Sequence, residues 1–220
     1  YMLQANNIFK TYEKGNVQET VVLRNVCAEF EQGVFYAIIG KSGSGKTTLL
    51  NILCGLDSPD QGHVLLDGTD IYKLTRRKRA ILRRRKIGFI FQSYNLLQEH
   101  TALENIFMPY ILDHRKPDRI YIDKVCSMLE IDTLLNKYPM QMSGGEQQRV
   151  AIARAIVHRP KIIFADEPTG NLDPQTGRNT LALLKEIVTQ FGSTLILVTH
   201  DISVAEEAQQ VLKVEGGIIT

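Results

Sequence analysis

The chain has 220 residues, 44% of them hydrophobic, and a formal net charge of +2 at pH 7, so it can bury the core of one α/β domain. Its three cysteines are odd in number and far apart, which excludes a disulfide framework and a zinc site and favours a reducing, cytoplasmic setting. No signal peptide opens the chain and no apolar run approaches the roughly 20 residues that cross a bilayer, so we expect any membrane role to come through a partner.

Two β-prone segments, residues 3–11 and 21–30, open the chain, and a polar loop that contains Gly15 joins them. This pattern predicts a hairpin-like start. Tyr12 stands at the end of the first segment, where an exposed tyrosine beside a loop usually has no special role. A turn at Gln32 and Gly33 leads into the next strand.

A glycine-rich loop follows an apolar run at residues 34–39 and precedes an apolar helix at residues 49–56. The pattern G-x-x-x-x-G-K-[ST], between a strand and a helix, is typical of a polyphosphate site, because glycines bring backbone amides against the phosphates and the helix N-terminus adds positive field. Lys46 is expected to reach the β- and γ-phosphates, and the Thr47 hydroxyl to bind Mg²⁺. A plain Gly/Ser-rich turn is the alternative, and the agreement of spacing, strand and helix disfavours it. The chain is therefore predicted to bind a nucleoside triphosphate. The residues predicted to bind it form the phosphate loop: Gly40, Lys41, Ser42, Gly43, Ser44, Gly45, Lys46, Thr47 and Thr48.

A turn-rich stretch at residues 57–62 and a short strand at 63–67 precede a strongly basic run. Eight of the eleven residues at 76–86 are Lys or Arg, and none is acidic. A nucleic-acid patch is one interpretation. The run has no interleaved aromatic residues and carries an apolar centre, which favours a helix that is solvated or faces a partner protein.

A short apolar strand at residues 87–91 ends at Gln92, and the carboxyl edge of a parallel sheet is where α/β proteins bind ligands. Gln92 is therefore a candidate contact for Mg²⁺ or an attacking water. From residue 93 to about 156 the pattern becomes helical, with helices at 102–111 and 119–129 and a third from about Ser143, punctuated by Pro109, Pro117 and Pro139. We interpret this region as an inserted helical subdomain.

The third helix begins with a serine and two glycines, which suits the binding of an anion at its N-terminus. The local alternative is an ordinary capping box, because an acidic residue stands three positions after the serine. By itself the short pattern favours the capping box. The residues concerned are Ser143, Gly144, Gly145 and Glu146.

An apolar strand at residues 161–165 delivers Asp166 and Glu167 to its carboxyl end. Downstream of a phosphate loop, such an aspartate is placed to hold Mg²⁺, and the glutamate to orient or deprotonate water. A solvated strand end is the alternative. Residues 168–174 form a turn and 175–191 a helix; the strand at 194–199 brings His200 to the same edge, and a hairpin at 211–219 closes the chain.

Together these elements resemble the nucleotide-binding subunits of ATP-binding cassette (ABC) transporters, over essentially the whole chain. The resemblance implies one α/β domain, residues 1–220, with a P-loop NTPase core and a mixed sheet at about 1–92 and 157–220. It also implies an N-terminal antiparallel β subdomain and an inserted helical subdomain at about 93–156.

The same resemblance implies roles for single residues. Tyr12 is similar to the aromatic residue that stacks on adenine, Glu167 to the catalytic base and His200 to the switch histidine. Gln92 resembles the glutamine that contacts Mg²⁺ and senses the permease, with Thr47 and Asp166 as further Mg²⁺ ligands.

Residues 143–146, named the signature turn below, resemble the signature motif, which reaches the γ-phosphate held by the other protomer. Asp173 belongs to the turn that resembles the D-loop. Met142 and Glu146 replace the usual leucine and glutamine of that motif, so the contact made by Glu146 is in doubt. One phosphate loop and one signature turn per chain imply a head-to-tail pair, expected to be a homodimer.

The implied function is that of an ATP-hydrolysing motor subunit of a bacterial transporter. It would be peripheral on the cytoplasmic face of the membrane and coupled to an integral membrane permease, with no nucleic acid expected. Within the family, residues 82–97 and 165–173 resemble the branch of macrolide-exporter, lipoprotein-releasing, cell-division and antimicrobial-peptide-resistance ATPases. The alternatives are a soluble cassette ATPase of DNA repair or translation, disfavoured by the short chain, and a regulatory ATP sensor, disfavoured by Glu167 and His200.

Overall fold

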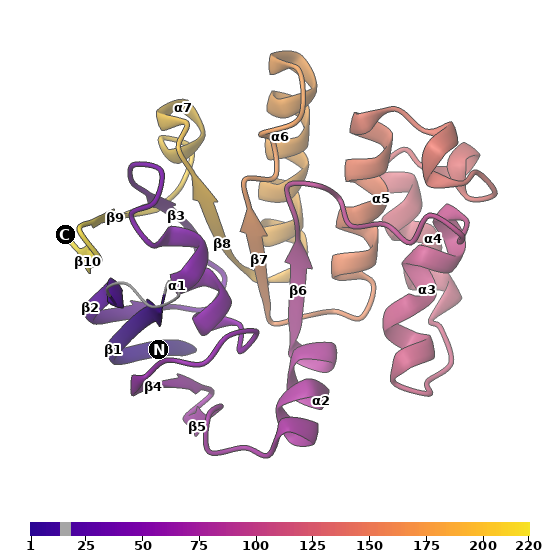
Figure 1. The fold of residues 1–220 in the computed structure, drawn as a ribbon. Coiled ribbons are helices and arrows are strands. Elements are labelled where there is room, and N and C mark those ends of the chain that lie inside the picture. Colours follow the sequence, from indigo (N-terminus) through magenta and orange to yellow (C-terminus); the bar gives the residue numbers. More distant parts are fainter. Residues whose placement is uncertain (14–18) are drawn as a thin grey trace. The chain divides into compact units, whose positions relative to one another are not determined.

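The computed structural model describes residues 1–13 and 19–220, which divide into two compact units. The first unit comprises residues 1–83 and 194–220, and the second comprises residues 84–193 (Figure 1). Gly15, in the predicted N-terminal loop, lies outside the described residues.

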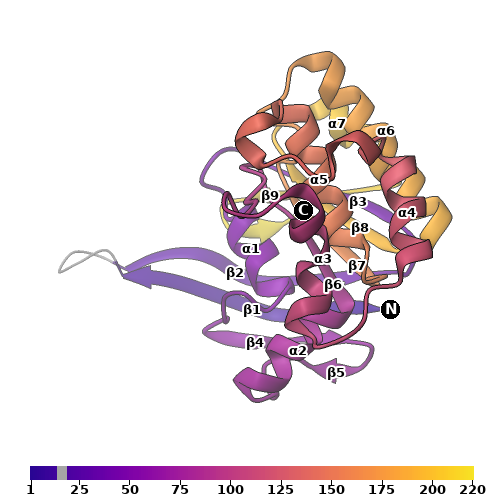
Figure 2. The ribbon, with the colours of Figure 1, turned by 90° about the vertical axis from the view of Figure 1, so that its right-hand side faces the viewer.

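An antiparallel sheet forms the N-terminal part of the first unit, in the order β2-β1-β4-β5. Figure 2 shows β1 and β2 side by side, and their antiparallel pairing confirms the predicted hairpin. Ile8 and Leu23 are fully buried, because alternate side chains of a half-buried strand face the core. The strands are β1 (Leu3–Glu13), β2 (Glu19–Phe30), β4 (Gln61–Leu66) and β5 (Thr69–Asp70).

A mixed set of strands, in the order β10-β9-β3-β8, forms the rest of the first unit's β structure. β3 runs parallel to β8 and β9, whereas β9 and β10 form the predicted antiparallel closing hairpin. The first four residues of β3 and all of β8 are buried, as expected for continuous apolar strands. The strands are β3 (Phe35–Ile39), β8 (Thr194–Thr199), β9 (Gln210–Glu215) and β10 (Ile218–Ile219).

Two helices lie wholly within this unit, and a third begins in it at Arg76 and ends in the second unit at Lys86. α1 (Lys46–Leu53) follows β3 with Leu49, Leu50, Ile52 and Leu53 buried, and the short α7 (Ile202–Ala205) follows β8 and was not predicted. The basic run forms α2 (Arg76–Lys86), which confirms the predicted helix, and none of its residues is buried.

The second unit holds the parallel pair β6 (Ile87–Ile90) and β7 (Ile162–Asp166) and four longer helices. The predicted helices are confirmed, and Pro109 lies inside α3 instead of at a helix end. The helices are α3 (Ala102–Leu112), α4 (Arg119–Met128), α5 (Gly144–Ile156) and α6 (Pro174–Phe191), with short 3-10 turns η1 (Asp132–Leu134) and η2 (Pro139–Gln141). The predicted subdomain at 93–156 lies wholly within this unit, and its separate status stays a prediction.

None of the helices found in residues 1–13 and 19–220 combines the length and the hydrophobicity that a bilayer crossing requires.

Candidate functional site

The phosphate loop connects β3 to α1 in the first unit. Gly43 and Gly45 adopt left-handed φ values of 76° and 101°, which favour glycine. A Cβ on Gly40 would collide with the carbonyl oxygen of Val214 and lie 2.7 Å from Ser44 Oγ, so only glycine fits at that position.

The polar groups of the loop suit a polyphosphate. Lys46 is 7% exposed, and its Nζ donates to the carbonyl oxygens of Gly40 and Lys41, both at 2.9 Å, which keeps the ammonium group at the loop. Ser44 Oγ is buried without a hydrogen-bond partner in the described part of the chain. An ammonium group and an unsatisfied hydroxyl beside a helix N-terminus fit phosphate oxygens.

Tyr12 and the phosphate loop line the same pocket, of about 280 Å³. The other lining residues are Val22 on β2 and five residues of the loop and the first turn of α1. The predicted base platform and the predicted phosphate site are therefore brought together by the fold of the first unit. Their roles stay predictions.

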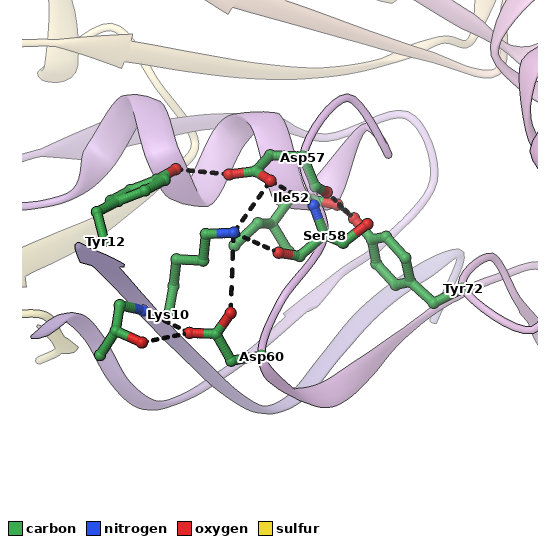
Figure 3. Close-up of polar contacts among 8 residues, drawn as sticks. Lys10, Tyr12, Ile52, Asp57, Ser58, Asp60 and Tyr72 are labelled. Atoms are coloured by element: carbon green, nitrogen blue, oxygen red, sulfur yellow. Dashed lines mark hydrogen bonds and ion pairs between the residues drawn. The ribbon is translucent and has the colours of Figure 1, made fainter. Parts of the chain in front are cut away.

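A polar cluster fixes Tyr12 from one side (Figure 3). The Tyr12 hydroxyl donates to Asp57 Oδ2 at 2.5 Å, and Lys10 Nζ donates to Asp57 Oδ1 at 3.0 Å. Burial alone would raise the pKa of Asp57. These two hydrogen bonds, a third from the Ser58 backbone amide and the positive charge of Lys10 together outweigh burial and hold the pKa below its usual value. Tyr12 was predicted from the sequence to contact the base, whereas Asp57 was predicted only to lie in a turn.

His200 follows β8 directly. Because Ile39 of β3 stands opposite Thr199 of β8 in the parallel register, His200 and the start of the phosphate loop lie at the same edge of the strands. Asp201 caps α7 by accepting from the Ser203 backbone amide at 2.8 Å. His200 therefore lies at the predicted edge, and its contact with a phosphate and its catalytic role stay predictions.

The second unit carries Gln92, Asp166 and Glu167 at one edge. Ile90 of β6 stands opposite Ala165 of β7 in a parallel register, so the residues that follow both strands emerge together. A Cβ on Gly170 would lie 2.9 Å from Gln92 Nε2 and 3.3 Å from Glu167 Oε2. The side chains of Gln92 and Glu167 therefore converge on Gly170.

Glu167 has an unusual backbone conformation, with φ at 45° in the left-handed region. A non-glycine residue there costs of order 1–3 kcal/mol, and such strain concentrates at functional sites. The turn after it is held by hydrogen bonds from Gly170 N to Glu167 O at 3.0 Å and from Asn171 Nδ2 to Gln92 O at 3.0 Å. The contact of Asn171 with the Gln92 backbone was not foreseen.

The signature turn forms the capping box that its local pattern predicts. Glu146 N donates to Ser143 Oγ at 3.3 Å, and Ser143 N donates to Glu146 Oε2 at 2.7 Å. This backbone hydrogen bond from Ser143 holds the pKa of Glu146 below its usual value. In this structure the Glu146 carboxylate therefore caps the N-terminus of α5.

A pocket of about 310 Å³ joins the signature turn to the turn that carries Asp173. The two signature glycines allow close packing, because a Cβ on Gly145 would lie 2.7 Å from Thr176 Cγ2 and one on Gly144 would lie 2.8 Å from the Tyr94 hydroxyl. Asp173 caps α6 by accepting from the backbone amides of Gln175 and Thr176, both at 3.1 Å.

Gln148 is a further residue that sequence reasoning missed. It is fully buried on α5, and its Nε2 donates to the Pro168 carbonyl oxygen at 2.8 Å. This hydrogen bond ties the signature helix to the residue that follows Glu167. The signal in the sequence was a glutamine on the face of the predicted helix that otherwise carries apolar residues. A glutamine buried there needs a hydrogen-bond partner for its amide.

Comparison with known proteins adds independent findings. A family model described as "ABC transporter" matches residues 23–170. An uncharacterized ABC transporter ATP-binding protein of Methanocaldococcus jannaschii is 45% identical over 222 residues, covering 99% of this chain and 97% of that protein. The lipoprotein-releasing system ATP-binding protein LolD of Shewanella frigidimarina is 42% identical, covering 99% of this chain and 92% of that protein.

Among solved structures, the chain is similar to the ATP-binding cassette MJ0796, a dimer in a post-hydrolysis state bound to ADP and Pi. The TM-score is 0.90 with 40% sequence identity, covering 99% of this chain and 96% of that one.

Proposed function

Because this chain belongs to the ABC transporter family, we propose that it is the ATP-hydrolysing subunit that drives a separate membrane permease. It is an ABC-type ATPase, which splits ATP and water into ADP and phosphate. The observation that carries the proposal is the pocket in which Tyr12 meets the phosphate loop, because it offers an aromatic face and a polyphosphate cradle together.

The first unit supplies nucleotide binding. Lys46 neutralises the β- and γ-phosphates, and the loop amides and the Ser44 hydroxyl donate hydrogen bonds to phosphate oxygens. Tyr12 stacks on the base. Mg²⁺, when bound with ATP, neutralises charge on the phosphates. The residues that fit it are the Thr47 hydroxyl, the Asp166 carboxylate and the Gln92 amide oxygen, since oxygen donors suit this hard cation.

Hydrolysis requires a group that handles the proton of the attacking water. Glu167 takes this role, because its carboxylate is held beside the Gln92 amide at Gly170 by a strained backbone. Gln92 orients the water, and His200 contacts the γ-phosphate at the edge that it shares with the phosphate loop.

Two chains act together, head to tail. Each chain holds one phosphate loop and one signature turn, and both are helix N-termini suited to an anion. A nucleotide bound between two copies uses the loop of one and Ser143 of the other. The pocket that joins the signature turn to Asp173 suits this contact, and the dimeric form of the similar cassette MJ0796 supports it.

Closure of the pair on ATP, and its opening after hydrolysis, then moves an attached permease at the cytoplasmic face of the membrane. The similarity to LolD supports the branch that contains the lipoprotein-releasing ATPases. Gln92, which follows β6, links the nucleotide to the permease.

The test is the dependence of the ATPase rate on protein concentration. If two copies complete each site, the rate per chain rises with concentration and saturates as pairs form. Co-purification with a multi-spanning membrane protein tests the coupling to a permease. A rate per chain that is maximal and constant at every dilution would contradict the shared site.

A further inference from the structure

Tyr12 is held at its edge and at one ring face. Its side chain is 41% exposed, and its hydroxyl donates to Asp57 Oδ2 at 2.5 Å. Lys10 Nζ lies 4.9 Å from the ring centroid, at a distance typical of a cation–π contact. A tyrosine held in two ways keeps its ring in one orientation.

The two residues that hold Tyr12 are themselves anchored. Lys10 is 8% exposed, and its ammonium donates to Asp57 Oδ1 at 3.0 Å and to the Ser58 carbonyl oxygen at 2.7 Å. Asp57 also accepts from the Ser58 backbone amide at 2.7 Å, and Asp60 Oδ1 lies 3.9 Å from Lys10 Nζ. The anchor therefore joins β1 to the turn that follows α1 through several polar contacts (Figure 3).

The protonation states of the pair persist around neutral pH. Burial and the hydrogen bond to Asp57 raise the pKa of Tyr12, and the pKa of Asp57 is lowered. The phenol thus remains a donor and the carboxylate an acceptor.

We infer that Lys10 and Asp57 are positioning residues that clamp the Tyr12 ring as a flat platform for a purine base. The inference rests on the proposed function, in which Tyr12 contacts the base. Because the hydroxyl is committed to Asp57, Tyr12 offers the base its free ring face and no polar group. Stacking uses the flat face of the base and none of its polar groups, so the platform by itself does not distinguish ATP from GTP.

The test compares three ligands by titration calorimetry: ATP, GTP and inorganic tripolyphosphate, which has no base. The variants are Tyr12→Phe, Asp57→Ala and the double variant, with Glu29→Gln as a control for loss of an exposed carboxylate elsewhere in the same sheet. Without the hydrogen bond between Tyr12 and Asp57 the ring can reorient, and fixing it when the base binds costs conformational entropy. We expect each single variant to bind ATP and GTP about three- to tenfold more weakly, with tripolyphosphate affinity unchanged.

The double variant should show no loss beyond that of Asp57→Ala, because both substitutions remove the same hydrogen bond and Asp57→Ala also removes the anchor of Lys10. Tyr12→Phe keeps the contacts of Asp57 with Lys10 and Ser58, so it carries the test even if Asp57→Ala does not fold. The clamp is overturned by unchanged nucleotide affinity in Tyr12→Phe, by an equal loss of tripolyphosphate affinity, or by additive losses.

A Tyr12→Ala variant distinguishes failure of the clamp from failure of the base platform. If it weakens ATP binding while Tyr12→Phe does not, the clamp fails and the base platform stands. If Tyr12→Ala binds ATP normally, the platform in the proposed function fails as well.

Discussion

Gly170 gives the sharpest prediction about catalysis. It ends the turn that begins at Glu167, and no left-handed φ is found there, so its backbone accepts alanine. The added Cβ would lie 2.9 Å from Gln92 Nε2, whereas ordinary contact begins at 3.4 Å. It would also lie 3.3 Å from Glu167 Oε2. The methyl group therefore pushes apart the two side chains proposed to handle the attacking water.

The size of the effect follows from the displacement. The Gln92 amide must retreat by roughly 0.5–1 Å, and a misplacement of about 1 Å can cost about 10²-fold in rate. We expect Gly170→Ala to lower kcat about ten- to a hundredfold, or roughly 1.4–2.7 kcal/mol of activation free energy. The free energy of unfolding should change by less than about 0.5 kcal/mol, because the end of a flexible side chain can move aside.

Steady-state ATPase kinetics measure kcat, and urea titration measures the free energy of unfolding. ATP affinity, measured by titration calorimetry, should hardly change. Gly177→Ala is the matched control. A Cβ there meets Thr169 Cβ at an ordinary 3.5 Å, and alanine inside α6 should stabilise the helix by up to about 1 kcal/mol. If Gly170→Ala turns over ATP like the unmodified protein, the convergence of Gln92 and Glu167 has no catalytic meaning.

Four further predictions concern single side chains. Lys46→Ala should abolish ATP binding by removing the phosphate-neutralising ammonium, and undiminished affinity in calorimetry would refute the phosphate-loop assignment. Glu167→Gln should bind ATP, hydrolyse it slowly and accumulate dimers in size-exclusion chromatography with ATP, because the water loses its base; unimpaired turnover would falsify that role. Ser143→Arg should block turnover and spare ATP binding by the monomer, and normal ATPase activity in this variant would count against a site shared by two copies. Since the folded pKa of Glu146 lies below its unfolded value, its stabilisation is present above the unfolded pKa and is lost as the pH falls through the folded pKa. Glu146→Gln should lose less stability than the unmodified protein between pH 7 and pH 3 in urea titrations, and equal losses would contradict this.

Much of the site was predictable because its signals are local. The phosphate loop needs a strand, three glycines and a helix within about twenty residues, and the capping box of Ser143 and Glu146 needs four. Asp166 and Glu167 were found in the same way, as acidic residues that directly follow a buried strand. Each of these patterns is complete within one element and its neighbour, so the sequence contains all of it.

Contacts between distant segments were decided only by the tertiary structure. The Tyr12 hydroxyl meets Asp57 across 45 positions, and the Asn171 side chain meets the Gln92 backbone across 79. No periodicity links such residues; they meet because β1 pairs with β4 beyond the turn of Asp57, and because β6 and β7 run parallel in register. The amino-acid sequence by itself determined which chemical groups this protein carries and on which elements. Packing determined which of them meet, because the partner of a side chain depends on the register and direction of strands that are far apart in the chain.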